Sequence, residues 1–212
     1  MTFAATVTLC ASLLVAPAVA AQSTDTSERF REAMSACVLP GPGLELREER
    51  LAQVGWQPVA PSPRITATYA DALTVFGPPE GETAEDWQAR RAEAAAIADA
   101  QSGGGLFTYG SSVILTELQS GTDAPTCFLM TLNSRESDLL FADLTRFGAA
   151  TDLPFGRRGE LSTTQFDSSG QAWRTDITVV SADAARIDPL LNAPLQASLA
   201  ALFVTHPKEA AE

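Results

Sequence analysis

The sequence has very few of the side chains on which most catalytic and metal sites depend. Of its 14 Lys and Arg residues only Lys208 is a lysine, and the single histidine is His206, close to the C-terminus. Histidine and lysine are common general bases, and histidine with cysteine forms most zinc sites. Three cysteines occur, Cys10, Cys37 and Cys127, without a Cys-x-x-Cys pair. The sequence therefore disfavours a zinc centre, a Ser-His-Asp triad and a dithiol redox site.

Motifs for phosphate binding and for an activated serine are also missing. The sequence has no Gly-Lys-Ser/Thr loop and no G-x-S-x-G elbow, and the glycines at 103–105 follow a predicted helix instead of preceding one. Arg157 and Arg158, beside Gly156, could meet an anion, although arginines on an edge strand also discourage strand pairing. The net charge of -12 argues against a nucleic-acid partner, which needs clustered basic residues.

The first 20 residues have the pattern of a secretory signal peptide. Residues 3–21 carry no charge and are mostly Ala, Val and Leu, and Ala18-Val19-Ala20 is a small-x-small cleavage site. We therefore predict cleavage after Ala20 and a periplasmic or secreted protein, as in export of the Gram-negative type. The alternative is an uncleaved anchor, but the run is at the short limit of the ~20 apolar residues that a span needs, and Pro17 interrupts it. No stable membrane span is expected once the signal is removed.

Cleavage would leave two cysteines, Cys37 and Cys127, in an exported chain. Disulfides form and persist in oxidising compartments, so we predict a disulfide between them. The alternative is a pair of buried free thiols, which would pack as small apolar side chains.

The rest of the chain is predicted to form one α+β domain over residues 21–206, followed by a loose tail at 207–212. Its composition, 45% hydrophobic and 19% charged, is that of an ordinary globular protein. Apolar spacing, caps and alternation predict helices over about 28–37, 45–54, 69–75, 84–101, 137–147 and 194–204, and strands over about 113–117, 126–132, 158–167 and 173–179. We therefore predict N-terminal helices followed by a β-β-α-β-β-α arrangement, with helices packed on one face of a four- or five-stranded antiparallel sheet.

The predictions of two of these helices rest on a few residues each. Ser137 is expected to be the N-cap of the helix over 137–147. In the last helix, Leu195, Leu199 and Leu202 have the spacing of a helical stripe, and Pro194 suits the first turn. His206 would then follow the end of this helix, next to the tail.

The densest acidic cluster is the one candidate for a ligand or cation site. It comprises Glu80, Glu82, Glu85 and Asp86, and Trp87 follows it. These carboxylates could bind a hard cation such as calcium. Carboxylates at the start of a helix also satisfy its free N–H groups and its dipole, and Thr83 with Asp86 fits a capping box. Trp87 could line a ligand cleft or anchor the core. The capping and core interpretations are favoured.

On these grounds the sequence predicts an exported, non-enzymatic domain that binds an envelope protein or a small ligand. No catalytic residue, cofactor or metal ligand is assigned. A second hypothesis is a hydrolase of cell-wall glycan that uses only carboxylates, since any two of the 26 Asp and Glu residues could meet in space. A third hypothesis is a purely structural envelope protein.

Overall fold

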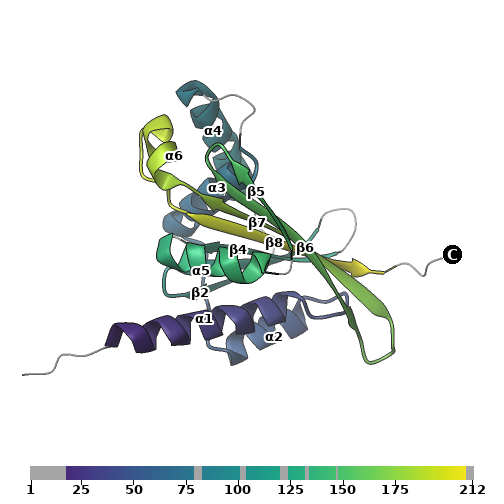
Figure 1. The fold of residues 1–212 in the computed structure, drawn as a ribbon. Coiled ribbons are helices and arrows are strands. Elements are labelled where there is room, and N and C mark those ends of the chain that lie inside the picture. The colour runs from purple at the N-terminus through teal and green to yellow at the C-terminus, as the bar shows by residue number, and fades with distance from the viewer. Residues whose placement is uncertain are drawn as a thin grey trace, which may run out of the picture.

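The computed structural model describes residues 18–78, 83–100, 104–119, 124–131, 134–146 and 148–208. They form an α+β fold of three layers, in which an eight-stranded sheet lies between two layers of helices (Figure 1). The helices are α1 (Ala18–Cys37), α2 (Glu45–Gln53), α3 (Pro63–Phe76), α4 (Ala84–Ala100), α5 (Ser134–Thr145) and α6 (Ala184–Leu191). The strands are β1 (Gln57–Pro58), β2 (Gly105–Tyr109), β3 (Ser112–Leu118), β4 (Pro125–Thr131), β5 (Ala149–Leu153), β6 (Gly156–Phe166), β7 (Ala172–Ala182) and β8 (Leu199–Pro207).

The sheet has the strand order β1-β2-β3-β4-β8-β7-β6-β5, and every neighbouring pair is antiparallel. The last strand of the chain, β8, therefore lies in the middle of the sheet, between β4 and β7. The long hairpin of β6 and β7 projects beyond the helices at one end of the sheet (Figure 1). At its other end, the same hairpin meets β5 and α6.

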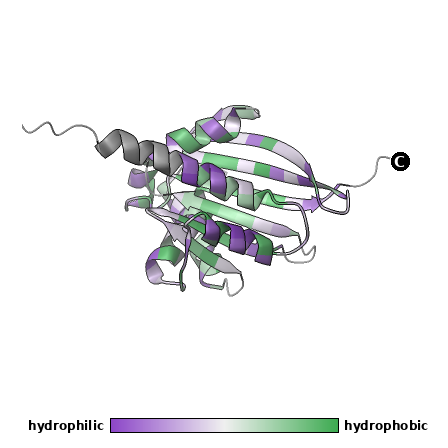
Figure 2. Ribbon diagram, turned by 90° about the horizontal axis from the view of Figure 1, so that it is seen from below, coloured by the Kyte–Doolittle hydropathy of each residue, from purple (hydrophilic) through white to green (hydrophobic). Residues whose placement is uncertain are grey.

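Two hydrophobic cores, one on each face of the sheet, hold the layers together. The first core joins α1, α2 and α5 to the sheet, and the second joins α3, α4 and α6 to the opposite face. Along β4, Cys127 and Leu129 belong to the first core, whereas Phe128 and Met130 belong to the second. Figure 2 shows this arrangement as largely green central strands beneath helices that alternate green and purple. Because helices cover both faces of the sheet, β4 has apolar residues pointing to each face.

The two cysteines of the described chain lie together, as predicted. Cys37 is the last residue of α1 and Cys127 lies in β4, and their Cα atoms are 5.6 Å apart, which is disulfide-bonding distance. Both side chains are buried in the first core. The pair therefore ties the N-terminal helix to the centre of the sheet.

The C-terminal segment is a strand, so the helix predicted over 194–204 is wrong. β8 pairs with β4 on one side and with β7 on the other. Residues 199–203 are apolar at every position, so the leucines among them also have the spacing of a helical stripe. Periodicity alone does not distinguish a helix from a central strand in such a run. Leu199 belongs to the first core and Ala200 to the second. Burial on both faces therefore decided the conformation.

His206 consequently lies on a central strand and not in a tail. Its imidazole Nε2 is 3.6 Å from a carboxylate oxygen of Asp176 on β7. β8 ends at Pro207, and the Lys208 N–H donates to the Ala172 carbonyl over 2.9 Å, so these first residues of the predicted tail at 207–212 lie against β7. The rest of that tail lies outside the described residues.

The predicted sheet was also too small, and its helices cover both faces instead of one. The strands β1, β2 and β5 and the helix α6 were not predicted. β5 has no buried residue that would produce an alternating pattern, and α6 contains Pro189, which suggests a helix end. Ser137 lies inside α5, which begins at Ser134, so it is not the N-cap. Its hydroxyl makes a tertiary contact instead.

Candidate functional site

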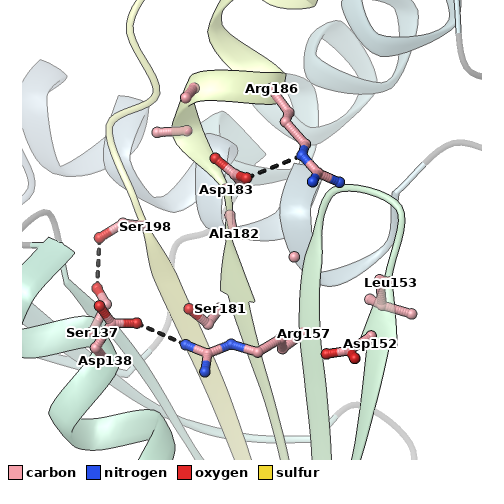
Figure 3. A pocket seen from close by; sticks show the side chains of 13 residues that line it. Ser137, Asp138, Asp152, Leu153, Arg157, Ser181, Ala182, Asp183, Arg186 and Ser198 are labelled. Carbon is pink, nitrogen blue, oxygen red and sulfur yellow. Dashed lines mark hydrogen bonds and ion pairs between the residues drawn. The ribbon is translucent and has the colours of Figure 1, made fainter.

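A cavity of about 660 Å³ lies at the end of the sheet where β5, β6 and β7 meet the N-terminal parts of α5 and α6 (Figure 3). Its polar side chains are Ser137, Asp138, Asp152, Arg157, Ser181, Asp183, Arg186 and Ser198. Most of the remaining lining is alanine and glycine. The cavity therefore combines two arginines and three aspartates with hydroxyl groups, and these come from segments far apart in the sequence.

Three of these side chains form a row across the sheet. Asp152 of β5 is the register partner of Arg157 on β6, and Arg157 is the register partner of Ser181 on β7. Residues directly opposite each other in antiparallel strands point to the same face of the sheet. The row therefore places an aspartate, an arginine and a serine on one face of three neighbouring strands, whose backbones are about 4.8 Å apart. The Arg157 side chain extends from this row past Ser181 toward Asp138 (Figure 3).

The middle group of the row, Arg157, is held in place by α5. Its Nη2 donates to a carboxylate oxygen of Asp138 over 2.7 Å, as the dashed line in Figure 3 shows. The centre of the guanidinium lies 4.6 Å from the ring centroid of Phe141, one turn further along the helix. The ion pair and the cation–π contact together position a charged group at the cavity without occupying all of its N–H donors.

Two buried serines join α5 to the segment before β8 beside the cavity. Ser198 donates to the Thr131 carbonyl over 3.1 Å, and the Ser137 and Ser198 oxygens are 2.6 Å apart. The two serine hydroxyls therefore share one hydrogen bond, and Ser198 makes a second with the Thr131 carbonyl. Both hydroxyls are thus satisfied, and their role is to fix this wall of the cavity.

The same segment is anchored from the other face of the sheet. The Gln196 N–H donates to Asp71 over 2.6 Å, and Arg91 donates to both oxygens of that carboxylate over 2.7 and 3.0 Å. Asp71 is fully buried, and burial raises its pKa, while the Gln196 N–H and Arg91 act in the opposite direction. This network links α3, α4 and the chain two residues before Ser198, so the cavity wall rests on a rigid support.

The N-terminus of α6 borders the cavity with free backbone donors. The first N–H groups of a helix have no acceptor within the helix and carry a partial positive charge. Asp183 stands at the N-cap but makes no side-chain cap, and its carboxylate lies 3.1 Å from Nε of Arg186 instead. Ala184 and Ala185, the first two residues of the helix, line the cavity. Their N–H groups are therefore available at this boundary.

Two polar side chains that line the cavity differ from the others in their lack of a partner. Within the described ranges, neither Asp152 nor Ser181 makes a side-chain hydrogen bond or an ion pair. Ser181 is only 6% exposed, yet its side chain borders the cavity. Ser181 is therefore a nearly buried residue whose hydroxyl is accessible from the cavity and can donate to or accept from a polar group of a ligand.

The acidic cluster singled out in the sequence lies elsewhere, at the start of α4. Glu80 and Glu82 lie outside the described residues. The Asp86 N–H donates to the Thr83 hydroxyl over 3.2 Å, and the Thr83 N–H and hydroxyl donate to the Asp86 carboxylate over 3.2 and 2.5 Å. These contacts are those of a capping box. In the part of the chain that the structure describes, no three His, Cys, Asp or Glu side chains are grouped to hold a metal ion.

Trp87 lies in the second core and not at the cavity. Its side chain is fully buried, and its ring centroid is 4.9 Å from that of Phe155 in a T-shaped contact. Phe155 lies in the loop between β5 and β6, so this contact helps to hold the loop beside the cavity. Trp87 thus packs as a core residue, close to the site but not exposed to it.

Sequence reasoning did not identify the cavity. One signal was available, because Arg157 beside Gly156 was noted as a possible anion contact. The edge-strand interpretation of this arginine does not hold, since β6 is covered by β5 and lies inside the sheet. Neither Asp152 nor Ser181 belongs to a motif, and only the strand register brings them to the same row.

Comparison with known proteins returned no match among family models, curated sequences or solved structures. Of the helices in the described ranges, none combines the length and the apolar character needed to cross a membrane. The interpretation of the site therefore rests on its own geometry.

Proposed function

We propose that this chain is an exported, non-enzymatic domain that binds a small polar ligand in the cavity between α5, α6 and the β5–β7 end of the sheet. The observation that carries the proposal is the hydroxyl that Ser181, a residue only 6% exposed, presents without a hydrogen-bond partner among the described residues to a cavity of about 660 Å³. Ligand pockets in proteins typically measure 300–1,000 Å³ and place a few polar groups among otherwise neutral walls. The cavity has both properties.

The charges of the cavity favour binding over carboxylate catalysis. A glycoside hydrolase needs one carboxyl group that holds a proton and a second that is ionised. Asp138 and Asp183 each form an ion pair with an arginine, so both carboxylates already have a charged partner. Asp152 is exposed to solvent. These surroundings suit the recognition of charged groups better than proton donation.

Export is part of the proposal, and two features support it. The uncharged N-terminal run ends in the cleavage site Ala18-Val19-Ala20. Cys37 and Cys127 lie at disulfide distance, and such pairs persist in oxidising compartments. Cleavage after Ala20 would leave the part of α1 from residue 21 to Cys37 in the mature protein.

Native mass spectrometry of protein purified from a bacterial periplasm tests the proposal. We expect extra mass that survives native conditions and leaves on denaturation. Ser181→Leu would place a larger side chain in the cavity and should abolish the extra mass. Ser162→Leu is the matched control, because Ser162 lies on the neighbouring strand β6, is exposed, and faces the opposite side of the sheet. The control should retain the extra mass.

Two results would contradict the proposal. Extra mass that is equal in both variants would place the ligand outside the cavity. A wild-type protein that never carries extra mass, and that gains no thermal stability in a screen of amino acids, short peptides, sugars and organic acids, would leave the cavity without a ligand. Circular dichroism of the variants verifies that both remain folded.

A further inference from the structure

We infer that the ligand is a short peptide of about three residues with a free amino and a free carboxyl end. This inference rests on the proposed function, since it names the ligand class of the same cavity. It follows from the positions of the two unpaired polar side chains, the charges that line the cavity and the spacing of the strands that carry them.

The amino end is assigned to Asp152. This carboxylate lies on the sheet's edge strand β5 and borders the cavity, and no ion pair or hydrogen bond involves its side chain within the described residues. The other two aspartates of the cavity already have arginine partners at 2.7 and 3.1 Å. A ligand ammonium would therefore find its free counter-charge at Asp152.

The carboxyl end is assigned to Ser181 and the N-terminus of α6. Ser181 is a buried residue whose hydroxyl borders the cavity and has no hydrogen-bond partner among the described residues, and the N–H groups of Ala184 and Ala185 are at the start of the helix, which has no side-chain cap. Arg186, in the same turn, adds a positive charge whose Nε and Nη1 are used by Asp183 and the Pro154 carbonyl. A hydroxyl, free helix N–H groups and a guanidinium together are a suitable environment for a carboxylate.

The separation of the two ends matches a tripeptide. Asp152 and Ser181 lie two strand spacings apart, on β5 and β7, which corresponds to about 9–10 Å. An extended chain rises 3.2–3.4 Å per residue, so three residues span about 10 Å. A free amino acid could reach only one end. Arg157 lies on the strand between them and extends toward Asp138 past Ser181 (Figure 3), so its remaining N–H groups can donate to the C-terminal part of a peptide.

The charge of the cavity favours a zwitterion over an anion. Two arginines and three aspartates leave the lining with one net negative charge. A sulfate or phosphate dianion would meet repulsion from the unpaired Asp152, and a sugar would use neither charged end. A peptide that is cationic at one end and anionic at the other complements both.

Isothermal titration of the exported protein, dialysed free of co-purified ligand, tests the assignment at pH 7. The probes are trialanine, N-acetyl-trialanine and trialanine amide. We expect trialanine to bind, and loss of either charge to weaken binding by about tenfold or more, as expected for a charge-assisted hydrogen bond. Asp152→Asn should reduce the affinity for trialanine but leave that for N-acetyl-trialanine unchanged. Ser181→Ala should weaken the N-acetyl probe more than the amide.

The matched controls carry the same substitutions away from the cavity. Asp99→Asn changes an exposed carboxylate on α4, and Ser162→Ala changes an exposed serine on β6, and both should bind as the wild type does. Equal affinity for all three probes, or an Asp152→Asn variant that binds trialanine like the Asp99→Asn control, would overturn the inference. If trialanine does not bind while the native extra mass is still lost in Ser181→Leu, the proposed function stands and the peptide assignment falls. If trialanine does not bind and the wild type carries no extra mass that Ser181→Leu removes, the peptide assignment and the proposed function are both wrong.

Discussion

At the scale of single residues, a side chain can hold a sharp turn through hydrogen bonds to residues close to it in the sequence. The clearest case is Asp167, at the tip of the β6–β7 hairpin. Its carboxylate accepts the Ser169 hydroxyl at 2.6 Å, the Trp173 indole N–H at 3.0 Å, and the N–H groups of Ser169 and Gln171 at 2.8 and 3.0 Å. These hydrogen bonds, the Ser169 and Trp173 side chains first, lower the pKa of Asp167 to about 2. The ionised carboxylate therefore holds the turn together.

The effect of Asp167→Asn on stability should depend on pH. The pKa in the folded protein, about 2, lies below the value of about 3.9 in an unfolded chain, so the folded state binds fewer protons between these values. The stabilisation is complete above about pH 4 and is lost as the pH falls toward 2. Thermal unfolding of both proteins from pH 2 to 7 should show a difference in Tm that shrinks below pH 4. A difference that is constant over this range would contradict the argument.

A buried arginine, Arg47, shows that a group with a shifted pKa can have a structural role. Arg47 of α2 is 1% exposed, and its guanidinium donates to the carbonyls of Leu39, Gly41 and Gly43. Burial lowers its pKa to about 10, which still leaves the group charged at neutral pH. The side chain closes the loop between α1 and α2 by satisfying three carbonyls, and it has no access to the cavity.

At the scale of elements, α4 begins with a reciprocal cap. Thr83 and Asp86 exchange backbone and side-chain hydrogen bonds across the first turn. This cap was predicted from the spacing of the two residues because it depends only on atoms within three positions of each other. The carboxylate of Asp86 is thereby used by the helix and not by a cation.

Removing the hydroxyl of this cap should destabilise the protein modestly. Thr83→Ala deprives the Asp86 N–H of its acceptor and should lower the free energy of unfolding by about 1 kcal/mol. Thr83→Ser, which retains the hydroxyl, should stay close to the wild type. Urea denaturation followed by circular dichroism measures both. Equal losses in the two variants would show that the hydroxyl is not the stabilising group.

At the scale of the whole molecule, the chain returns to the centre of the sheet only at its end. β8 completes both cores by inserting between β4 and β7, and the covalent pair Cys37–Cys127 ties α1 to β4 beside it. The two cysteines are 90 positions apart. A cross-link over such a long loop restricts the unfolded chain strongly.

Loss of this disulfide should therefore lower the stability of the protein strongly. In the chain-entropy description, a loop of this length contributes about 4 to 5 kcal/mol to the free energy of unfolding. Urea denaturation of the oxidised protein, of the reduced protein and of the Cys37→Ala/Cys127→Ala variant should give a lower midpoint for the last two. The reduced protein separates the effect of the cross-link from the small cavities that the alanines leave. Identical midpoints for oxidised and reduced protein would exclude a stabilising cross-link.

Local signals predicted the elements that depend on near neighbours. The helices over 45–54 and 84–101 and the hairpin of strands over 158–167 and 173–179 are confirmed with small shifts at their ends. The error at 194–204 has a different origin. A run that is apolar at every position becomes a strand or a helix according to what covers it, and only the assembled sheet supplies that information.

The sequence by itself determined the α+β class, the capping box at Thr83 and the strands of the β6–β7 hairpin, which follow from residue types and spacings along the chain. The pairing of Cys37 with Cys127 was predicted on the premise that a signal peptide carrying Cys10 is removed. The tertiary structure alone decided that β8 is a central strand, that helices cover both faces, and that Asp152, Arg157 and Ser181 share a row. The reason is physical: strand register joins residues that are remote in sequence, and no local preference of those residues specifies which partner they meet.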